Sequence, residues 1–303
     1  MTRAGLADDA LLADPWRLNA DLHCHSMYSD GVLRPAELVR RAGERGVSML
    51  ALTDHDDIEG LPEAAAAAAD HGLIFVPGVE ISVTWAGKTI HVVGLGIDPQ
   101  APALVQGLAR IRSVRDGRAR EIGDSLGKAG IAGAYEGALE HVRNPALVSR
   151  THFARFLVQA GVCESVNDVF QHYLVEGRPG YVPQQWARLG EAVQWILAAG
   201  GTAIVAHPGR YKLDETALWA FMGEFREAGG TAIEVITGSH TRDQYRRFAT
   251  VAREFGFMAS RGSDFHGPGE SRVDLGDLPL LPDSVVPVWH DWPQALLAQP
   301  VSP

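Results

Sequence analysis

Histidines and carboxylates recur at the ends of short apolar runs in this 303-residue chain. His23 and His25 form an H-x-H pair after the run that begins at Leu18, and period-two alternation in an extended segment directs both imidazoles to one side. Asp30 follows five residues later, within Ser-Asp-Gly. Imidazole nitrogens and carboxylate oxygens bind divalent metals, so this segment is a candidate for part of a metal site.

The same residue types follow or interrupt the later apolar runs. They are His55 between Asp54 and Asp56, Glu80, His91, His207, Asp264 and His266. Because a buried carboxylate such as Glu80 is costly without a cation or strong donors, its apolar setting also favours a metal. Strand ends that face one end of a barrel bring such side chains together, and we predict one metal site built from all of them. Nitrogen and oxygen ligands favour Mn, Zn or Fe over soft-metal or iron–sulfur chemistry, and the side chain of Cys24 should point away from His23 and His25.

Short apolar runs and helical patterns alternate along most of the chain, which is typical of repeated β-α units and an α/β barrel or parallel sheet. The first predicted strand starts at Leu18. The other predicted strands span Val47–Leu52, Leu73–Val76, Val79–Thr84, Ile90–Leu95, Thr202–Ala206, Ala232–Ile236 and Phe257–Ser260. The predicted helices span Pro35–Arg45, a stretch containing Ala64–Ala69, Gly190–Ala199, Glu215–Ala228 and Arg242–Phe255. A turn at Ala86-Gly87 separates two of the strands.

The alternation stops at Asp98-Pro99, and helical patterns dominate as far as about Pro179, including Leu104–Leu126 and His152–Ala160. We interpret this stretch as an inserted helical subdomain. The predicted organisation is therefore a first barrel part at 17–98, an insertion at 99–180 and a second barrel part at 181–303.

Bulk properties exclude several classes of function. The apolar content of 46% suffices for a buried core, whereas the net charge of −10 argues against stable binding to long nucleic acid. No secretory signal pattern and no membrane-spanning run is expected, and two cysteines, Cys24 and Cys163, are too few for a disulfide framework. We expect a cytoplasmic protein without a membrane association.

Taken together, the polar motifs resemble those of the PHP family, the polymerase-and-histidinol-phosphatase superfamily of metal-dependent phosphoesterases. The matching segments are D-L-H-C-H-S with S-D-G, T-D-H-D, G-V-E-I-S, I-H-V-V-G, A-H-P and G-S-D-F-H, in order over about 250 residues. The resemblance implies a distorted (β/α)7 barrel with three divalent ions, and Mn2+ is the expected metal, with Zn2+ or Fe2+ as alternatives.

The resemblance also distributes the ligands among the ions. It gives one ion His23, His25, Glu80 and Asp264, lets Glu80 bridge to a second ion with His91 and His207, and gives a third Asp30, His55 and His266. Glu80, Asp264 and His207 are thereby the expected catalytic centre. Asp30 stands where some relatives carry histidine, which makes the third site harder and more Mn-like.

The stretch after G-L-G-I-D-P, the R-T-H-F-A-R run and A-H-P-G-R-Y are most similar to a subgroup of nucleoside 3',5'-bisphosphate phosphatases related to enzymes that trim RNA from its 5' end. The expected reaction is attack of a metal-activated hydroxide on a nucleotide phosphomonoester, from a 3',5'-bisphosphate to a 5'-monophosphate, or on a short 5'-phosphorylated RNA. Two alternatives remain open: a histidinol-phosphate phosphatase and a non-catalytic metal-binding module.

Residues outside the metal ligands are candidates for substrate contacts. Arg210 is the first choice for a phosphate contact because a guanidinium binds phosphate through two hydrogen bonds, and Arg150 and His152 could reach it from the insertion. Each of these two could instead cap or flank a helix start. The remaining candidates are Lys212 and Arg178 near the pocket, Glu234 and His240 behind the ligands or at the rim, and Asp54 and Asp56 as partners of imidazoles. Trp186, Trp195 and Trp219 are expected to be packing residues, although one of these aromatic rings could stack on a base.

Overall fold

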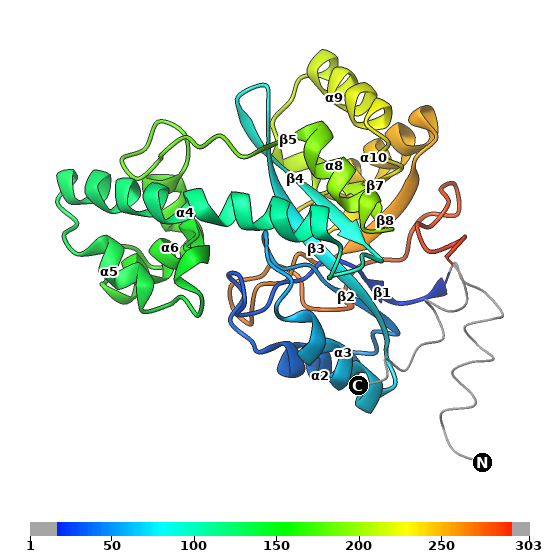
Figure 1. The fold of residues 1–303 in the computed structure, drawn as a ribbon, viewed down its shortest axis with the longest axis horizontal. Helices are drawn as coiled ribbons and strands as arrows, with labels where there is room; N and C mark the ends of the chain where they lie inside the picture. Colours follow the sequence, from blue (N-terminus) through cyan, green and yellow to red (C-terminus); the bar gives the residue numbers. More distant parts are fainter. Residues whose placement is uncertain (1–16, 293–303) are drawn as a thin grey trace.

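The computed structural model describes residues 17–292, which form a mixed α/β barrel with a helical projection (Figure 1). The strands run in the order β1-β2-β3-β4-β6-β7-β8 around the sheet, and β5 pairs with β3. Their bounds are β1 (Ala20–Asp21), β2 (Met49–Leu52), β3 (Ile74–Trp85), β4 (Lys88–Leu95), β5 (Ala187–Arg188), β6 (Thr202–Val205), β7 (Ala232–Thr237) and β8 (Met258–Gly262).

The sheet is nearly closed because its last strand lies beside its first. The amide of Leu22 donates to the carbonyl of Arg261 over 3.0 Å, and the amide of Asp264 donates to the carbonyl of His23 over 2.8 Å. β1, β2 and β3 are parallel, as are β6, β7 and β8, whereas β4 is antiparallel to both of its neighbours. The predicted barrel is thus confirmed, with one strand reversed by the β3–β4 hairpin.

β3 is one twelve-residue strand, although the sequence predicts two separate runs here. Pro77 stays within the strand, in register with Leu52, and its carbonyl accepts hydrogen bonds from two residues after β4. Gly78 allows close approach of the neighbouring strands, since a Cβ there would lie 3.0 Å from the carbonyl oxygen of Leu52 and 3.1 Å from that of Gly94. The long strand carries Glu80 in its middle, inside the barrel end.

The helices cover the outside of the sheet, except for those that project from it (Figure 1). Their bounds are α2 (Pro35–Glu44), α3 (Leu61–His71), α4 (Pro102–Lys128), α5 (Ala134–Leu139), α6 (Arg150–Gln159), α7 (Val166–Val169), α8 (Leu189–Ala198), α9 (Glu215–Glu227) and α10 (Arg242–Phe255). Short helices are η2 (Pro145–Leu147), η3 (Phe170–Leu174) and η4 (Pro208–Arg210). Local sequence explains several of the ends: Pro35 opens α2, Thr241 accepts from the amide of Gln244 at the start of α10, and Gly256 ends α10 with a φ of 69°.

Buried apolar side chains form two separate clusters, one in the barrel and one in the projection. Helix α4 connects them: Leu104 and Leu108 belong to the barrel cluster, whereas Ile122 and Leu126 belong to the cluster of the projection. The helical stretch expected at 99–180 therefore shares its first helix with the barrel. The division into three segments stays a prediction, and the end of the last segment lies outside the described residues.

Between residues 17 and 292, no helix is both long and apolar enough to cross a membrane. Cys24 is buried, and its thiol donates to the carbonyl of Ala51 over 3.1 Å, away from the flanking imidazoles as predicted. Trp195 packs against the barrel core, and Trp219 lies 4.8 Å from Phe255 between ring centroids, so both are packing residues.

The two clusters on one helix give a matched test of the architecture. Leu108→Ala and Leu126→Ala should each lower the free energy of unfolding by about 2–5 kcal/mol, because each removes a fully buried side chain. Hydrogen exchange measured by mass spectrometry should rise in β3 and β4 for Leu108→Ala but mainly in residues 119–174 for Leu126→Ala. Equal exchange in the barrel strands for both variants would mean that the clusters form one cooperative core.

Candidate metal centre

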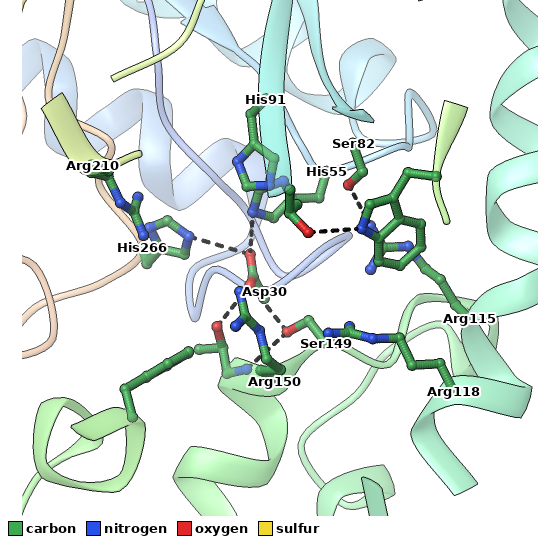
Figure 2. Close-up of a pocket in the computed structure, with 14 residues that line it drawn as sticks. Asp30, His55, Ser82, His91, Arg115, Arg118, Ser149, Arg150, Arg210 and His266 are labelled. Atoms are coloured by element: carbon green, nitrogen blue, oxygen red, sulfur yellow. Dashed lines mark hydrogen bonds and ion pairs between the residues drawn. The ribbon is translucent and has the colours of Figure 1, made fainter. Parts of the chain in front are cut away.

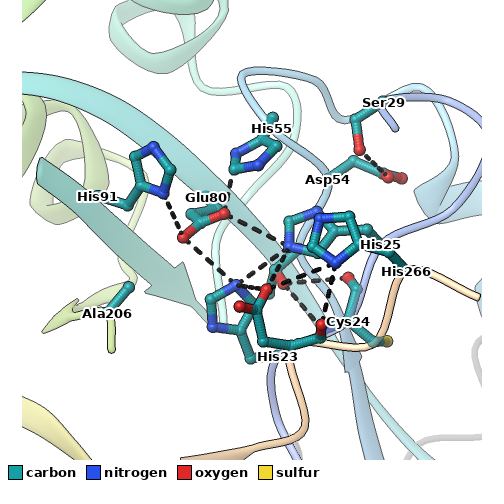
Figure 3. A network of polar contacts seen from close by, with 12 residues as sticks. His23, Cys24, His25, Ser29, Asp54, His55, Glu80, His91, Ala206 and His266 are labelled. Carbon is teal, nitrogen blue, oxygen red and sulfur yellow. Dashed lines mark hydrogen bonds and ion pairs between the residues drawn. The ribbon is translucent and has the colours of Figure 1, made fainter. Parts of the chain in front are cut away.

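The predicted ligands come from seven places in the chain and meet at one end of the barrel. Figure 3 shows six of them close together: His23, His25, His55, Glu80, His91 and His266. His23 and His25 follow β1, Asp30 lies in the next loop, His55 follows β2, Glu80 lies in β3, His91 in β4, His207 follows β6, and Asp264 and His266 follow β8. His91 lies near the start of its strand rather than at its end. The antiparallel direction of β4 nevertheless brings it to the same end of the barrel.

The ring of His23 faces a set of acceptor atoms. Its Nδ1 lies 2.8 Å from Oε1 of Glu234, so that the nitrogen donates its hydrogen there. The lone pair of Nε2 then points toward Nε2 of His25 at 3.2 Å, Oε1 of Glu80 at 3.4 Å and Oδ1 of Asp264 at 3.6 Å. Acceptors this close repel one another unless a proton or a cation lies between them. The donor set therefore fits a divalent ion, and Glu234 supplies the carboxylate that metal-binding histidines commonly contact.

Glu80 is fully buried at the centre of the cluster, and its two oxygens face different imidazoles. Oε1 lies 2.9 Å from Nδ1 of His91 and 2.9 Å from Nε2 of His207. Oε2 lies 2.8 Å from Nδ1 of His55 and 3.4 Å from Nε2 of His25. Burial by itself would raise the pKa of Glu80, but the facing imidazoles, with His91 and His55 foremost, hold it well below the ordinary value. This geometry suits a carboxylate that bridges two cations.

Asp30 lies on the opposite side of His55 and carries the third group of ligands. Its Oδ1 lies 3.3 Å from Nε2 of His266 and 3.8 Å from Nε2 of His55. Burial opposes protonation of His266, yet the nearby Asp30 carboxylate raises its pKa to about 9. Without a bound cation, a proton on the His266 ring thus compensates the negative charge of Asp30.

Four overlapping groups have candidate ligand atoms within 4.8 Å of one another. They are His23 with Glu80 and His207; His23 with His25 and Asp264; His55 with Glu80 and His91; and His25 with Asp30, His55 and His266. The family-based distribution placed His91 and His207 around one ion, whereas here each shares Glu80 in a separate group. Two ring nitrogens of these side chains, His25 Nδ1 and His207 Nδ1, are buried without a hydrogen-bond partner within residues 17–292. Unpaired buried polar atoms of this kind are expected where cations bind.

Glu234 and His240 support the segment that carries His207. Oε2 of Glu234 accepts from the backbone amide of His207 over 2.6 Å, which helps to hold that residue at a positive φ of 27°. Nε2 of His240 accepts from the amide of Gly209 over 3.0 Å, and its Nδ1 donates to the carbonyl of Val235. Of the two positions considered from the sequence, behind the ligands or at the rim, the contacts agree with the first for both residues.

The two acidic residues beside His55 do not contact imidazoles, and that prediction is wrong. Asp54 accepts from the amide and the hydroxyl of Ser26, both over 2.7 Å. Asp56 accepts from the amide of Ser82 over 2.7 Å and from its hydroxyl over 2.9 Å, and it forms a buried ion pair with Arg115 of α4. Both carboxylates therefore connect backbone segments, because the local loop geometry turns them away from the ligand side.

A cleft lies between this cluster and the projection (Figure 2). The barrel contributes Asp30, His55, Ser82, Thr89, His91, Trp186, Arg210 and His266 to its lining, and the projection contributes Arg115, Arg118, Ser149, Arg150, Thr151 and Phe170.

Of the three predicted substrate-binding residues, two line the cleft and one is buried at a helix start. Arg210 lines the cleft, is half exposed and donates to Oδ2 of Asp264 over 2.8 Å. Arg150 also lines the cleft, over the ring of Phe170. His152 is buried, and its Nδ1 accepts from the amide of Ser149 over 3.0 Å at the start of α6. We therefore assign His152 to the capping of α6 instead of to substrate binding.

Sequence reasoning missed two arginines of the cleft. The guanidinium carbons of Arg115 and Arg118 lie 4.8 and 5.2 Å from the ring centroid of Trp186. Their spacing of three in a long helix was the available signal, since it places both on one face of α4. Lys212 and Arg178, which were expected near the pocket, are not among its lining residues.

Comparison with known proteins agrees with this geometry. The model of the PHP domain matches residues 21–237. A 3',5'-nucleoside bisphosphate phosphatase of Chromobacterium violaceum is 51% identical over 90% of this chain and 96% of its own, and a 5'-3' exoribonuclease of Haemophilus influenzae is 44% identical over 89% and 97%.

Solved structures give the same result. One of an amidohydrolase from C. violaceum with bound sulfate and no metal has a TM-score of 0.89 and 50% identity, covering 94% of this chain and 99% of that one. Another, from Bifidobacterium adolescentis and described as a metal-dependent phosphoesterase, has a TM-score of 0.77 and 26% identity over 90% and 94%. The predicted resemblance is thereby confirmed: this chain belongs to the PHP domain family and is a metal-dependent phosphoesterase.

Proposed function

We propose that this protein removes a phosphate from nucleoside 3',5'-bisphosphates, and that it cleaves the 3'-phosphate to leave a 5'-monophosphate. The observation that carries the proposal is the wall of the cleft opposite the metal cluster, which is lined by Arg118 and Arg150 and is called the arginine wall below. The name of the C. violaceum relative, at 51% identity, supports the same substrate class.

The wall carries positive charge that no carboxylate balances. Within the described part of the chain, neither Arg118 nor Arg150 forms an ion pair; Arg118 donates to the carbonyl of Val182 and Arg150 to that of Leu174. Burial lowers the pKa of Arg118 to about 9, and burial together with the charge of Arg210 lowers that of Arg150. Both remain cationic near neutral pH. An anionic group bound at this wall would pair with these two buried cations, and a second phosphate of the substrate is such a group.

We propose three bound ions, with Mn2+ as the metal. Divalent cations would activate water and neutralise charge on the phosphoryl oxygens. Glu80 would hold two of them at a fixed spacing, with Asp264 and His207 on either side. Arg210, anchored by Asp264 and half exposed, can donate its remaining N–H groups to the phosphate. Trp186 and Phe170 also line the cleft, and a nucleobase would contact the parts of their rings that Arg115, Arg118 and Arg150 leave uncovered.

A short RNA with a 5'-phosphate is a second candidate, because the H. influenzae relative, at 44% identity, is named a 5'-3' exoribonuclease. Histidinol phosphate remains a less favoured substrate, since it would leave the arginine wall without a second anion. A non-catalytic role is disfavoured by the complete set of candidate ligands. We place the reaction in the cytoplasm.

The substrate proposal predicts a selective effect of the wall. Arg118→Gln and Arg150→Gln should each lower kcat/KM for adenosine 3',5'-bisphosphate by about 10- to 100-fold, because a charge-assisted hydrogen bond contributes roughly 1.5–3 kcal/mol. kcat/KM for AMP should change much less. Arg178→Gln, an exposed arginine outside the cleft lining, is the matched control.

Steady-state kinetics with chromatographic identification of the product separates the alternatives. Equal kcat/KM for the bisphosphate and AMP in the wild-type protein would refute the two-phosphate site. If the product were adenosine 3'-monophosphate, the 5'-phosphate would be the one cleaved at the metals. If 5'-phosphorylated oligonucleotides or histidinol phosphate were preferred in the same panel, that compound would be the substrate instead.

A second prediction concerns the bridging carboxylate. Glu80→Gln should lower turnover by more than about two orders of magnitude, since changes to mere neighbours of metal ligands already cost 10- to 100-fold. The fold should persist, because the apolar barrel core is unchanged. Phosphate release in excess Mn2+ and circular dichroism measure the two effects, with the exposed Glu227→Gln as control. Near wild-type turnover would exclude the bridging role.

A third prediction concerns pH. The pKa of His266 is about 9 in the metal-free protein, so its ring carries a proton at neutral pH that an incoming ion must displace. Metal affinity should therefore rise with pH between about 6.5 and 8.5, by roughly tenfold per unit for each proton released. Isothermal titration of Mn2+ in buffers of different ionisation enthalpy counts these protons. Binding without proton release at pH 7 would show that the ring is already neutral.

A further inference from the structure

Two hydroxyl groups of the projection hold one oxygen of the candidate ligand Asp30. Oδ2 of Asp30 accepts from Oγ1 of Thr151 over 2.9 Å and from Oγ of Ser149 over 3.1 Å (Figure 2). Both hydroxyls belong to the start of α6, while the carboxylate belongs to the barrel loop after β1. A predicted metal ligand is thus hydrogen-bonded across the boundary between barrel and projection.

The direction of these bonds determines which oxygen is left for an ion. Oγ of Ser149 already accepts from the backbone amide of Thr151 over 3.1 Å, so its single hydrogen is free to donate to Asp30. With two donors on Oδ2, the other oxygen is the one available. That atom, Oδ1, is buried, has no hydrogen-bond partner within residues 17–292, and faces Nε2 of His266 at 3.3 Å and Nε2 of His55 at 3.8 Å. The arrangement favours binding of an ion through one oxygen only.

The same helix also holds the segment that follows His266. Arg155 of α6 donates to the backbone carbonyl of Asp30 over 2.5 Å and forms two hydrogen bonds to Glu270, over 2.9 and 2.8 Å. Helix α6 therefore contacts the loops of two ligands in this group.

We propose that Ser149 and Thr151 are positioning residues for the ion held by Asp30, and that the inserted helices thereby set the affinity of that one site. The inference rests on the metal sites of the proposed function but not on its substrate. Among the described residues, the hydrogen bonds of Glu80, His207 and Asp264 come from the barrel, so the other ions should not depend on α6.

The test compares Thr151→Val, which keeps the shape but removes the donor, with Thr151→Ser, which keeps the hydroxyl. Isothermal titration of Mn2+ into the metal-free full chain measures affinity and number of ions, and elemental analysis after dialysis measures occupancy. Thr151→Val should weaken one ion by about 10- to 100-fold and leave the others unchanged, as for other residues that orient metal ligands. Thr151→Ser should bind like the wild type. Thr250→Val, an exposed position on α10, controls for the exchange of threonine for valine in a helix.

Three results would overturn the proposal: an unchanged isotherm for Thr151→Val, equal weakening of all ions, or a loss in Thr151→Ser as large as in Thr151→Val. The melting temperature of each metal-free variant identifies a general loss of folding, which would appear as the second of these results. Phosphate release is not part of the readout. If the expected binding pattern occurs in a protein that hydrolyses no nucleotide, the proposed function fails while this inference stands.

Discussion

The candidate metal centre is arranged around one buried carboxylate, that of Glu80. Glu80 lies fully inside the barrel end, and each of its oxygens faces imidazoles from different parts of the chain. A buried carboxylate carries a desolvation penalty of several kcal/mol, which must be offset by cations or protonated partners. The β3–β4 hairpin pairs His91 with Ser82, two residues after Glu80, and so brings this imidazole beside the carboxylate.

Several carboxylates behind the candidate ligands hold the ligand rings or their loops in place. Glu234 contacts both the ring of His23 and the backbone of His207, which couples two candidate ligands through one side chain. Asp54 and Asp56 hold the loops instead of the rings. The ion pair of Asp56 with Arg115 also attaches α4 to the barrel, beside the arginines that line the cleft. The barrel end and the projection are therefore joined by buried polar contacts.

Sequence reasoning predicted the barrel and the assembly of ligands because these depend on local patterns: polar residues at strand ends and alternation of apolar runs. It failed where the outcome depends on long-range packing. The merging of two predicted strands at Pro77 requires knowledge of the neighbouring strands. The position of Arg115 and Arg118 in the cleft depends on the path of α4. His152 caps a helix because its ring accepts a hydrogen bond from the amide of Ser149. No periodicity in the sequence specifies those partners.

We propose that Glu80 lies between two cations at the end of the barrel. Anomalous diffraction from crystals soaked in Mn2+ would locate each ion without reference to activity. We expect peaks within the histidine and carboxylate cluster, with the Glu80 carboxylate between two of them and a further peak beside Asp30 and His266. A single peak, or peaks that leave Glu80 without an ion on either side, would contradict it.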